Sequence, residues 1–172
     1  MTGESIHLNT VRLLLKPVTA DDFDQVYAMF TNEFVKKYLF DDEIISKEKV
    51  QSFIETSTQT FIEKHYGLWI IQLKSADEAI GFTGLWPFFD EAQPQLLYAL
   101  LPNFTGCGYA IEASLKVIDY AFSKLGFSYL DASCDTPNSS SHQTALAIGM
   151  DKIREDTIDG KPTTFYRIYR QR

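Results

Sequence analysis

The sequence predicts a single domain of the α/β (α+β) class, in which helices flank a mixed, largely antiparallel sheet. Three observations lead to this prediction. The 172-residue chain is 45% hydrophobic and 14% aromatic, which is enough for one packed core. Three β-rich runs follow one another between residues 68 and 101, as in an antiparallel meander. A fourth run comes only after a long amphipathic helix, so residues 1–172 are expected to form one mixed domain.

The first third of the chain is expected to hold one strand and two helices. Residues 10–16 predict the strand, and Pro17 ends it. Residues 35–42 are expected to form an aromatic and charged connector, and Ser46 opens a second helix that runs to about residue 65 and stops at Gly67. Thr19 is expected to cap the first helix, because apolar residues then recur at helical spacing: Phe23, Val26, Tyr27 and Phe30.

The middle of the chain predicts the three-strand meander and the long helix. The strands are expected at residues 68–74, 79–87 and 95–101, with polar, turn-forming connections between them. The helix begins after a glycine-containing loop, and Glu112 and Lys116 are expected to pair on its surface, with Gly126 at its C-terminal cap. Its apolar stripe consists of Ile111, Leu115, Ile118 and Phe122.

The last part of the chain predicts a strand, a short helix and a hairpin. The strand at residues 129–133 is reached through the long helix, so it should lie parallel to the strand at 95–101. The short helix is expected over 138–148, and the hairpin has strands at 151–156 and 163–169 around a turn at 159–162.

Composition excludes several classes of protein. Sixteen basic and twenty-three acidic residues give a net charge of -7 without a basic cluster, so nucleic acid is not expected as a partner. No apolar stretch reaches about 18 residues, and residues 1–10 lack a secretory pattern, so we expect no membrane association and a cytoplasmic location. The oligomeric state stays open, with a homodimer compatible with the sequence.

The two cysteines do not indicate a metal or disulfide site. Cys107 and Cys134 have no metal-like spacing, so both are expected to be free thiols.

The loop between the third strand and the long helix suits a phosphate group. Gly106 and Gly108 let the backbone come close to a ligand at the positive end of the helix dipole. A pair of glycines alone is also compatible with a plain turn. If the loop binds a pyrophosphate, the donors are the backbone amides of Phe104, Gly106, Cys107, Gly108 and Tyr109.

Two segments, together with the order of elements, resemble the GNAT (Gcn-related) N-acetyltransferases. Residues 102–113, PNFTGCGYAIEA, are similar to the acetyl-CoA loop P-x-Y-W-G-x-G-Y-A-x-E-A of the branch that contains ribosomal-protein N-terminal and amino-sugar acetyltransferases. Residues 138–141 and 148–150 are similar to the N-x-x-S and the terminal G-F of the short helix in that branch. The resemblance implies that the two central parallel strands splay apart, with acetyl-CoA as co-substrate and no metal.

The resemblance also implies which residues bind acetyl-CoA. Asn138 would reach the pantetheine and Ser141 would lie near the thioester sulfur, although Asn138 after Pro137 is equally a good helix N-cap. The remaining implied acetyl-CoA contacts are Ala99, Leu100 and Leu101 on the strand, and Phe104, Thr105, Gly106, Cys107, Gly108, Tyr109 and Ala110 in the loop.

The chain departs from the family pattern at the acid and base. Ser133 and Ala145 stand where many members have a glutamate base and a tyrosine acid. Ser141 is then the best remaining donor to the leaving thiolate, and Asp135, on the face of Ser133, is the candidate to take the proton of the amine.

The expected reaction is direct attack of a primary amine on acetyl-CoA. The amine belongs to a small molecule or to a protein N terminus, and Trp86 and Phe88 are candidates to line its pocket. The amide of Leu101, or of a neighbouring strand residue, is expected to polarise the carbonyl, as the resemblance implies. The missing acid and base leave one alternative, a non-catalytic acyl-CoA-binding module.

Overall fold

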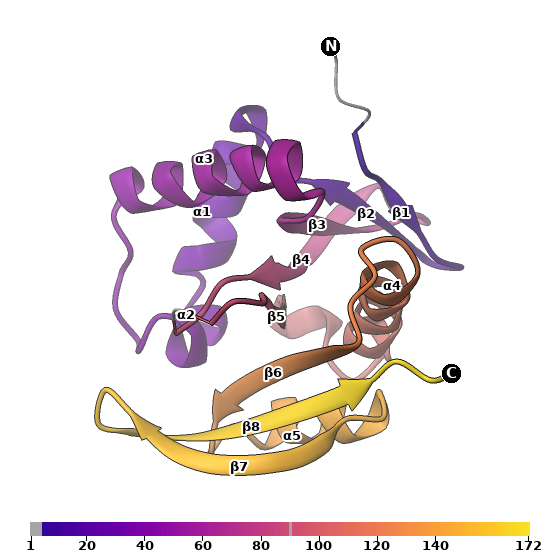
Figure 1. The fold of residues 1–172 in the computed structure, drawn as a ribbon. Coiled ribbons are helices and arrows are strands. Elements are labelled where there is room, and N and C mark those ends of the chain that lie inside the picture. Colours follow the sequence, from indigo (N-terminus) through magenta and orange to yellow (C-terminus); the bar gives the residue numbers. More distant parts are fainter. Residues whose placement is uncertain (1–4, 90) are drawn as a thin grey trace.

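Two antiparallel sheets form the body of the molecule, and helices cover them (Figure 1). The computed structural model describes residues 5–89 and 91–172. The first sheet has the strand order β1-β2-β3-β4-β5 and the second the order β6-β8-β7. The strands are β1 (Leu8–Asn9), β2 (Leu13–Pro17), β3 (Leu68–Leu73), β4 (Glu78–Trp86), β5 (Gln95–Leu100), β6 (Tyr129–Asp135), β7 (Asp151–Ile158) and β8 (Lys161–Tyr169).

The helices lie in two groups (Figure 1). Helices α1 to α3 pack on the first sheet, α4 contacts β1, β2, β4 and β5 of that sheet and also β6, and α5 contacts α4 and β6. The helices are α1 (Phe23–Thr31), α2 (Glu33–Leu39), α3 (Lys47–Lys64), α4 (Tyr109–Ser123) and α5 (Ser139–Ala147), with 3-10 turns at Ala20–Asp22 and Pro102–Phe104. The predicted α/β class is confirmed. Among the described residues, no helix is both long and apolar enough to cross a bilayer.

The N-terminal segment differs from the single strand predicted over residues 10–16. It forms a small hairpin in which β1 pairs with β2, Leu8 opposite Leu15. The turn between them is held by Thr10, whose Oγ1 accepts a hydrogen bond from the amide of Leu13 at 2.9 Å. The strand prediction was therefore right for residues 13–16 and wrong for 10–12.

Helix α2 corrects the prediction of a connector over residues 35–42. The side-chain oxygen of Asn32 accepts hydrogen bonds from the amides of Phe34 and Val35, which starts the helix. Buried Val35 is its apolar anchor. The sequence did not predict this helix, because its seven residues make too few turns to show a clear hydrophobic period.

Helix α3 begins as predicted and ends at Lys64, three residues before Gly67. The Ser46 hydroxyl accepts from the amide of Lys49, and His65 closes the helix in the left-handed conformation with φ of 64°. Gly67 has another role: a Cβ atom there would lie 2.7 Å from the Phe61 ring and from Ser57 Oγ. Glycine at 67 therefore permits close packing instead of ending the helix.

Strands β3, β4 and β5 form the predicted antiparallel meander. Strand β6 then lies beside β5 without pairing with it, since the two belong to different sheets. Gln93 Nε2 donates to the carbonyl of Tyr129 at 2.5 Å, and Ser133 Oγ donates to Gln95 Oε1 at 2.8 Å. These contacts advance in the same direction along both segments, so the two strands run parallel, and they separate beyond this point.

The surface of α4 differs from the prediction. Glu112 pairs with Arg12, at 2.6 Å between carboxylate and guanidinium, and Lys116 pairs with Asp119 instead of Glu112. Gly126 has the expected left-handed backbone with φ of 74°, but the helix already ends at Ser123. A tertiary partner for Glu112 has thus replaced the local pair.

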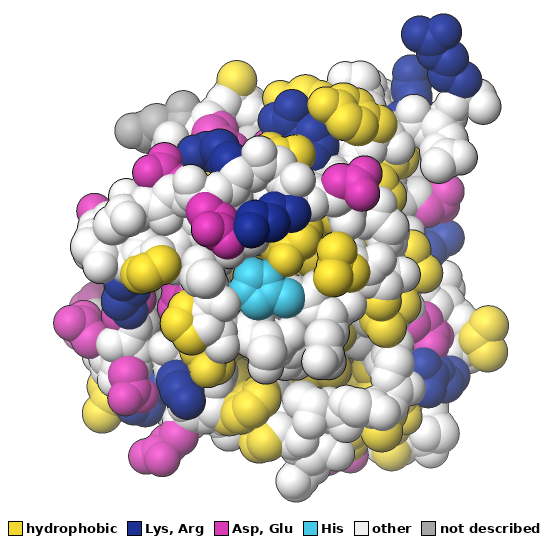
Figure 2. Space-filling model, turned by 90° about the horizontal axis from the view of Figure 1, so that it is seen from below, with side chains coloured by type: hydrophobic (Ala, Val, Ile, Leu, Met, Phe, Trp, Pro, Cys, Tyr) yellow, Lys and Arg dark blue, Asp and Glu magenta, His cyan; other side chains and the backbone are white. Residues whose placement is uncertain are grey.

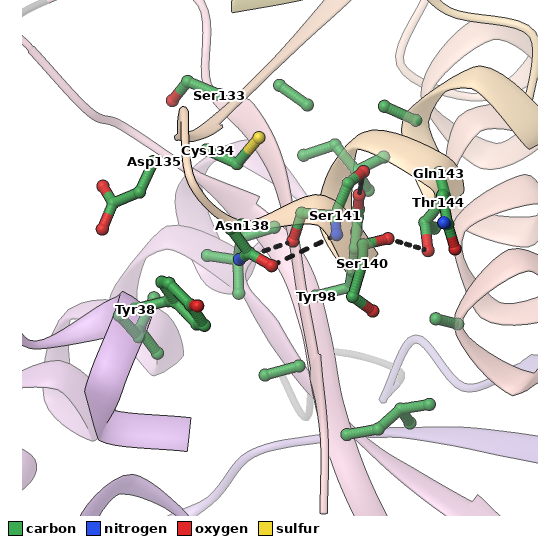
Figure 3. Close-up of a pocket in the computed structure, with 18 of the residues that line it drawn as sticks. Tyr38, Tyr98, Ser133, Cys134, Asp135, Asn138, Ser140, Ser141, Gln143 and Thr144 are labelled. Carbon is green, nitrogen blue, oxygen red and sulfur yellow. Dashed lines mark hydrogen bonds between the residues drawn. The ribbon is translucent and has the colours of Figure 1, made fainter. Parts of the chain in front are cut away.

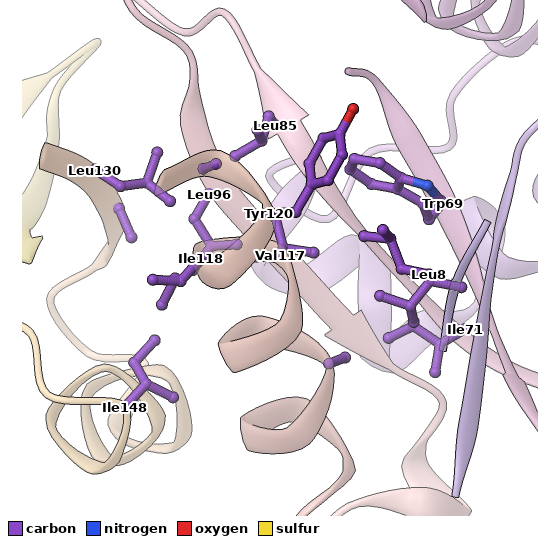
Figure 4. Packing of buried hydrophobic residues seen from close by; sticks show 14 of the residues in the cluster. Leu8, Trp69, Ile71, Leu85, Leu96, Val117, Ile118, Tyr120, Leu130 and Ile148 are labelled. Carbon is purple, nitrogen blue, oxygen red and sulfur yellow. The ribbon is translucent and has the colours of Figure 1, made fainter. Parts of the chain in front are cut away.

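Helix α4 connects the two sheets through the larger hydrophobic core. Figure 4 shows Val117 and Tyr120 of α4 between Leu130 of β6 and Trp69 of β3. Leu130, Val117 and Trp69 are fully buried. A second, smaller core lies beneath α1 and α3.

Strand β7 is an exposed edge strand with charges of both signs. Lys152 pairs with Glu155, and Arg154 pairs with Asp156. Figure 2 shows this side of the molecule, with acidic and basic side chains interspersed. The hairpin to β8 turns through Asp159 and Gly160 alone, whose φ values of 49° and 80° fit a type I′ turn.

Candidate functional site

One cavity of about 830 Å³ runs between the separating strands β5 and β6. At one end it is lined by the start of α4 and by α5, and at the other by α2, the segment after β4 and the β7–β8 turn. Figure 3 shows Tyr38 and Asp135 on one side of the view, Gln143 and Thr144 on the other, and Asn138 and Ser141 between them. The cavity has the size of a ligand site and two ends of different composition.

The glycine loop forms the wall next to α4. Gly106 and Gly108 have φ values of 76° and 82°, and a Cβ atom at Gly106 would meet nothing within 4 Å. The backbone amides of residues 106–109 have no hydrogen-bond partner among the described residues. With the N terminus of the 15-residue helix α4 behind them, these amides fit an anionic group such as a pyrophosphate.

Two residues of the predicted loop set are placed differently. The amide of Phe104 donates to the carbonyl of Leu101 at 3.0 Å, so it is not available as a phosphate donor. Neither Phe104 nor Cys107 is among the residues that line the cavity, and Cys107 is exposed. Thr105, Gly106, Gly108, Tyr109 and Ala110 do line it.

Arg12 supports the loop, and sequence reasoning missed it. Its Nη1 donates to the carbonyl of Cys107 at 2.9 Å, and its Nε donates to Glu112 Oε2 at 2.6 Å. The guanidinium carbon lies 4.4 Å from the centre of the Tyr109 ring. The only local signal was Glu112 within the loop motif, and its partner is 100 residues away.

Glu112 is held in its charged form. Burial would raise the pKa of this carboxyl, but hydrogen bonds from Thr10 and Arg12 outweigh it and lower the pKa. The carboxylate therefore remains available to orient Arg12 over the physiological range.

The edge of β5 presents Leu100, not Leu101, to the cavity. The amide of Leu101 donates to the carbonyl of Ile80 at 2.8 Å, which contradicts its expected role as donor to a ligand. Backbone groups alternate sides along an antiparallel strand, so the amides of Leu100 and Tyr98 face away from β4 and toward the gap. Ala99 and Leu100 line the cavity and Leu101 does not.

Asn138 and Ser141 are locked together at the start of α5 (Figure 3). Asn138 Oδ1 accepts from the Ser141 amide at 3.3 Å, so Asn138 is the helix N-cap. Its Nδ2 donates to Ser141 Oγ at 2.9 Å. Because Ser141 Oγ accepts this bond, its own hydrogen is free to be donated to another group.

Tyr98 connects the start of α5, where Asn138 and Ser141 lie, to β5. Its hydroxyl donates to the carbonyl of Ser141 at 3.1 Å across the gap between the sheets. Burial raises the pKa of Tyr98 well above its ordinary value, so the phenol stays protonated. Tyr98 thus positions α5 relative to the strand edge that carries the Leu100 amide.

Asp135 ends β6 and lines the cavity. Burial raises the pKa of Asp135, and Asp41 adds to the rise while Lys161 opposes it. Asp131, on the same strand, accepts two hydrogen bonds from Arg167 at 2.6 and 2.9 Å and is therefore a structural residue.

The end of the cavity near α2 is aromatic and charged. Phe88 lines it, together with Phe34, Tyr38 and Phe89. Trp86 does not line it, because its ring packs on Phe53 at 5.4 Å between ring centres, within the smaller core. The structure therefore brings Phe88, Asp135, Asn138 and Ser141 to one cavity and leaves Trp86 outside it.

Comparison with known proteins gives a consistent result. Residues 12–151 match the family model described as the acetyltransferase (GNAT) domain. The chain is 31% identical to the uncharacterized N-acetyltransferase YoaA of Bacillus subtilis (strain 168) over 146 residues, which are 84% of this chain and 82% of the relative.

Two solved structures with bound ligands share the fold. RimL, a ribosomal L7/L12 alpha-N-protein acetyltransferase in complex with coenzyme A, superposes with a TM-score of 0.80 at 11% identity, over 95% of this chain and 98% of that one. The microcin C7 self immunity acetyltransferase MccE, in complex with acetyl-CoA and AMP, gives 0.75 at 20% identity, over 93% of each chain. At these identities the similarity concerns the fold alone.

Proposed function

Because this chain belongs to the GNAT family of acetyltransferases, we propose that its cavity brings acetyl-CoA together with a primary amine that attacks the thioester directly. Acetyl-CoA-dependent N-acetyl transfer is the activity of the family. The observation that carries the proposal is the continuity of one cavity from the glycine loop, past Asn138 and Ser141, to Asp135. Both reactants can therefore meet in one space.

The chain offers fitting groups for the pyrophosphate and for the pantetheine arm of acetyl-CoA. The free amides of residues 106–109 suit the pyrophosphate, and Arg12 fixes the loop that carries them. The edge of β5 offers the backbone groups of Tyr98 and Leu100 to the pantetheine arm, whereas those of Ala99 face β4. These assignments follow from donors that face the cavity and have no other partner among the described residues.

The reaction needs two proton transfers and one oxyanion contact. The amine nitrogen bonds to the thioester carbon, and the Leu100 amide stabilises the oxyanion that forms. Collapse of the intermediate breaks the C–S bond, Ser141 Oγ donates its hydrogen to the leaving sulfur, and Asp135 takes the proton of the ammonium. That proton then passes from Asp135 through solvent to the Ser141 oxygen, which restores both side chains. Charge and atoms balance without a covalent enzyme intermediate.

Positioning supplies most of the expected acceleration. An α-amino group has a pKa near 8, so a useful fraction is neutral at physiological pH. Holding it about 3 to 3.5 Å from the thioester carbon removes roughly 7 to 11 kcal/mol from the barrier. A weak base such as Asp135 is then sufficient.

The acceptor is a protein N terminus or a small-molecule amine. An assay that follows release of the CoA thiol against a panel of amines and short peptides tests this, with mass spectrometry to identify the acetylated product. We expect release above the rate of acetyl-CoA hydrolysis for at least one amine. Binding of acetyl-CoA by calorimetry without release for any amine would contradict the proposal and leave a non-catalytic acyl-CoA-binding module.

Ser141→Ala tests the proton donor. We expect kcat to fall about tenfold to a hundredfold, because the thiolate then leaves without a proton, while the KM for acetyl-CoA changes little. Ser140→Ala is the matched control, since the Ser140 hydroxyl makes no hydrogen bond among the described residues and the helix is the same. Equal kcat values for the two variants would remove Ser141 from the mechanism.

A further inference from the structure

The two ends of the cavity differ sharply in charge. The end at the glycine loop and α5 is lined by neutral side chains and backbone. All the charged side chains among the described residues that line the cavity lie at the other end: Lys37, Asp41, Asp135, Asp159 and Lys161. Recognition of a charged acceptor must therefore take place at the end near α2.

Aromatic rings form the walls of this charged end. Phe34 and Tyr38 come from α2, and Phe88 and Phe89 come from the segment after β4. Phe34 and Phe89 are each 46% exposed, and Phe89 has a left-handed backbone with φ of 55°. Rings left open at a cavity, one of them on an unfavourable backbone, are typical of a binding surface.

Asp135 is the part-buried carboxylate at this end that lacks a partner among the described residues; Asp159, which makes no hydrogen bond or ion pair there either, is exposed. Asp41 is paired with Lys161, whereas the carboxylate of Asp135 has no hydrogen bond or ion pair with any described residue. Burial raises the pKa of Asp135, which means that the ionised form is short of stabilising contacts. An ammonium group beside it would supply them. Figure 3 shows Tyr38 on the same side of the view as Asp135.

The Asp41–Lys161 ion pair closes the end of the cavity. It joins the segment after α2 to the β7–β8 turn, 120 residues apart in the chain. Lys37 also lies at this end, and Lys161 is neutralised by Asp41. The site thus combines aromatic walls with the part-buried carboxylate of Asp135, which has no partner among the described residues.

We propose that this end of the cavity selects a primary amine carried on an aromatic or bulky apolar body. The amine is placed beside Asp135, and the body packs among Phe34, Tyr38 and Phe88. The inference rests on the acetyl transfer proposed above. An arylalkylamine and a chain N terminus with an aromatic first residue share this chemistry.

The test compares kcat/KM across matched acceptors, with rates corrected for the fraction of neutral amine. We expect 2-phenylethylamine to exceed ethylamine by roughly tenfold to a hundredfold, from burial of one ring. Heptapeptides that begin with Phe or with Gly form the second arm. A preference for the aromatic acceptor among the small amines alone indicates a small-molecule substrate, and a preference among the heptapeptides alone indicates a chain N terminus.

Variants of the aromatic wall show where the preference originates. Tyr38→Ala and Phe88→Ala should each reduce the preference severalfold and leave the KM for acetyl-CoA unchanged, because neither residue lies near the glycine loop. Tyr169→Ala is the matched control, since this tyrosine is 62% exposed and does not line the cavity. Thermal melting verifies that the variants fold.

A binding measurement separates this inference from the proposed function. Calorimetry of 2-phenylethylamine with the CoA-bound protein needs no turnover. Binding that Tyr38→Ala weakens supports the aromatic site even if no amine is acetylated, in which case only the proposed reaction fails. Equal kcat/KM values for the aromatic and the small amines, or binding that Tyr38→Ala leaves unchanged, would overturn the inference.

Discussion

Both polar atoms of the Asn138 side-chain amide form hydrogen bonds with Ser141, and these two bonds fix the Ser141 side chain. Its oxygen caps the helix through the Ser141 amide, and its nitrogen donates to the Ser141 hydroxyl. The sequence left capping and ligand binding open as alternatives for this residue. The structure shows capping, and it adds that capping itself orients the proposed proton donor.

Asp135→Asn separates catalysis from stability at the scale of one residue. We expect kcat/KM to fall by about a hundredfold at neutral pH, because the amide cannot take a proton. Wild-type activity should also decline as pH falls through the raised pKa of Asp135, and the pH profile of the variant should lack this decline. Steady-state kinetics between pH 5 and 9 are the measurement, and an unchanged profile in the variant would contradict the assignment.

The same substitution has the opposite effect on stability. The folded chain binds the Asp135 proton more tightly than the unfolded chain, whose pKa stays near 3.8. The stabilisation of the folded state by protonated Asp135 is therefore fully present below that value, and it is lost as pH rises through the folded pKa. At pH 7 the ionised carboxylate opposes folding, so Asp135→Asn should melt at a higher temperature than the wild type. Calorimetry should show this difference shrinking toward pH 3.5.

At the scale of elements, the glycine loop is held in place by the β1–β2 turn, which is distant in the sequence. Arg12, in the β1–β2 turn, contacts Cys107, Tyr109 and Glu112. These contacts hold the loop while the amides of residues 106–109 have no partner among the described residues. The loop is thus prepared for a ligand before the ligand binds.

Gly106→Asp tests the loop, with Gly126→Asp as its matched control. Both glycines have positive φ, 76° and 74°, and a Cβ at either position meets nothing within 4 Å, so backbone strain and space are alike. Only Gly106 lines the cavity. We expect at least about a hundredfold weaker acetyl-CoA binding for Gly106→Asp by calorimetry, from repulsion of the pyrophosphate, and near wild-type affinity for the control. Similar affinities for both variants would refute the loop assignment.

At the scale of the whole molecule, α4 makes the two sheets one folding unit. Its buried residues contact β3 and β6 at once, so the cavity lies between sheets that share a core (Figure 4). The gap between β5 and β6 is therefore held open by packing behind it, and it needs no ligand to form.

Leu130→Ala tests whether the sheets unfold together. Leu130 is fully buried in the second sheet, and its truncation should destabilise the protein by about 2–5 kcal/mol. The two tryptophans, Trp69 and Trp86, both lie in the first sheet, so their fluorescence reports that sheet alone. We expect the urea midpoint measured by tryptophan fluorescence to fall in Leu130→Ala. The midpoint should stay nearly unchanged in Leu146→Ala, because Leu146 lies on α5 and is 60% exposed. An unaffected midpoint in Leu130→Ala would mean that the sheets unfold separately.

The sequence predicted elements well where the signal was local. Ser46 and Asn138 act as helix caps in the structure as expected, because a cap involves only the next three residues. Thr19 precedes a 3-10 turn instead, and α1 begins after Asp22. Short α2 was missed, since it has too few residues for a clear hydrophobic period. The pairing of Glu112 with Lys116 was wrong, because Arg12 offers a second set of hydrogen bonds.

The sequence by itself determined the order of elements, the glycine loop and the Asn138–Ser141 corner, which depend on residues close together in the chain. Only the tertiary structure decided that Arg12 holds the loop and that Leu100 instead of Leu101 faces the cavity. It also assembled the aromatic and charged end from α2, the segment after β4, β6 and the β7–β8 turn. These contacts join segments that are about a hundred residues apart, and packing around α4, which no local pattern encodes, brings them together.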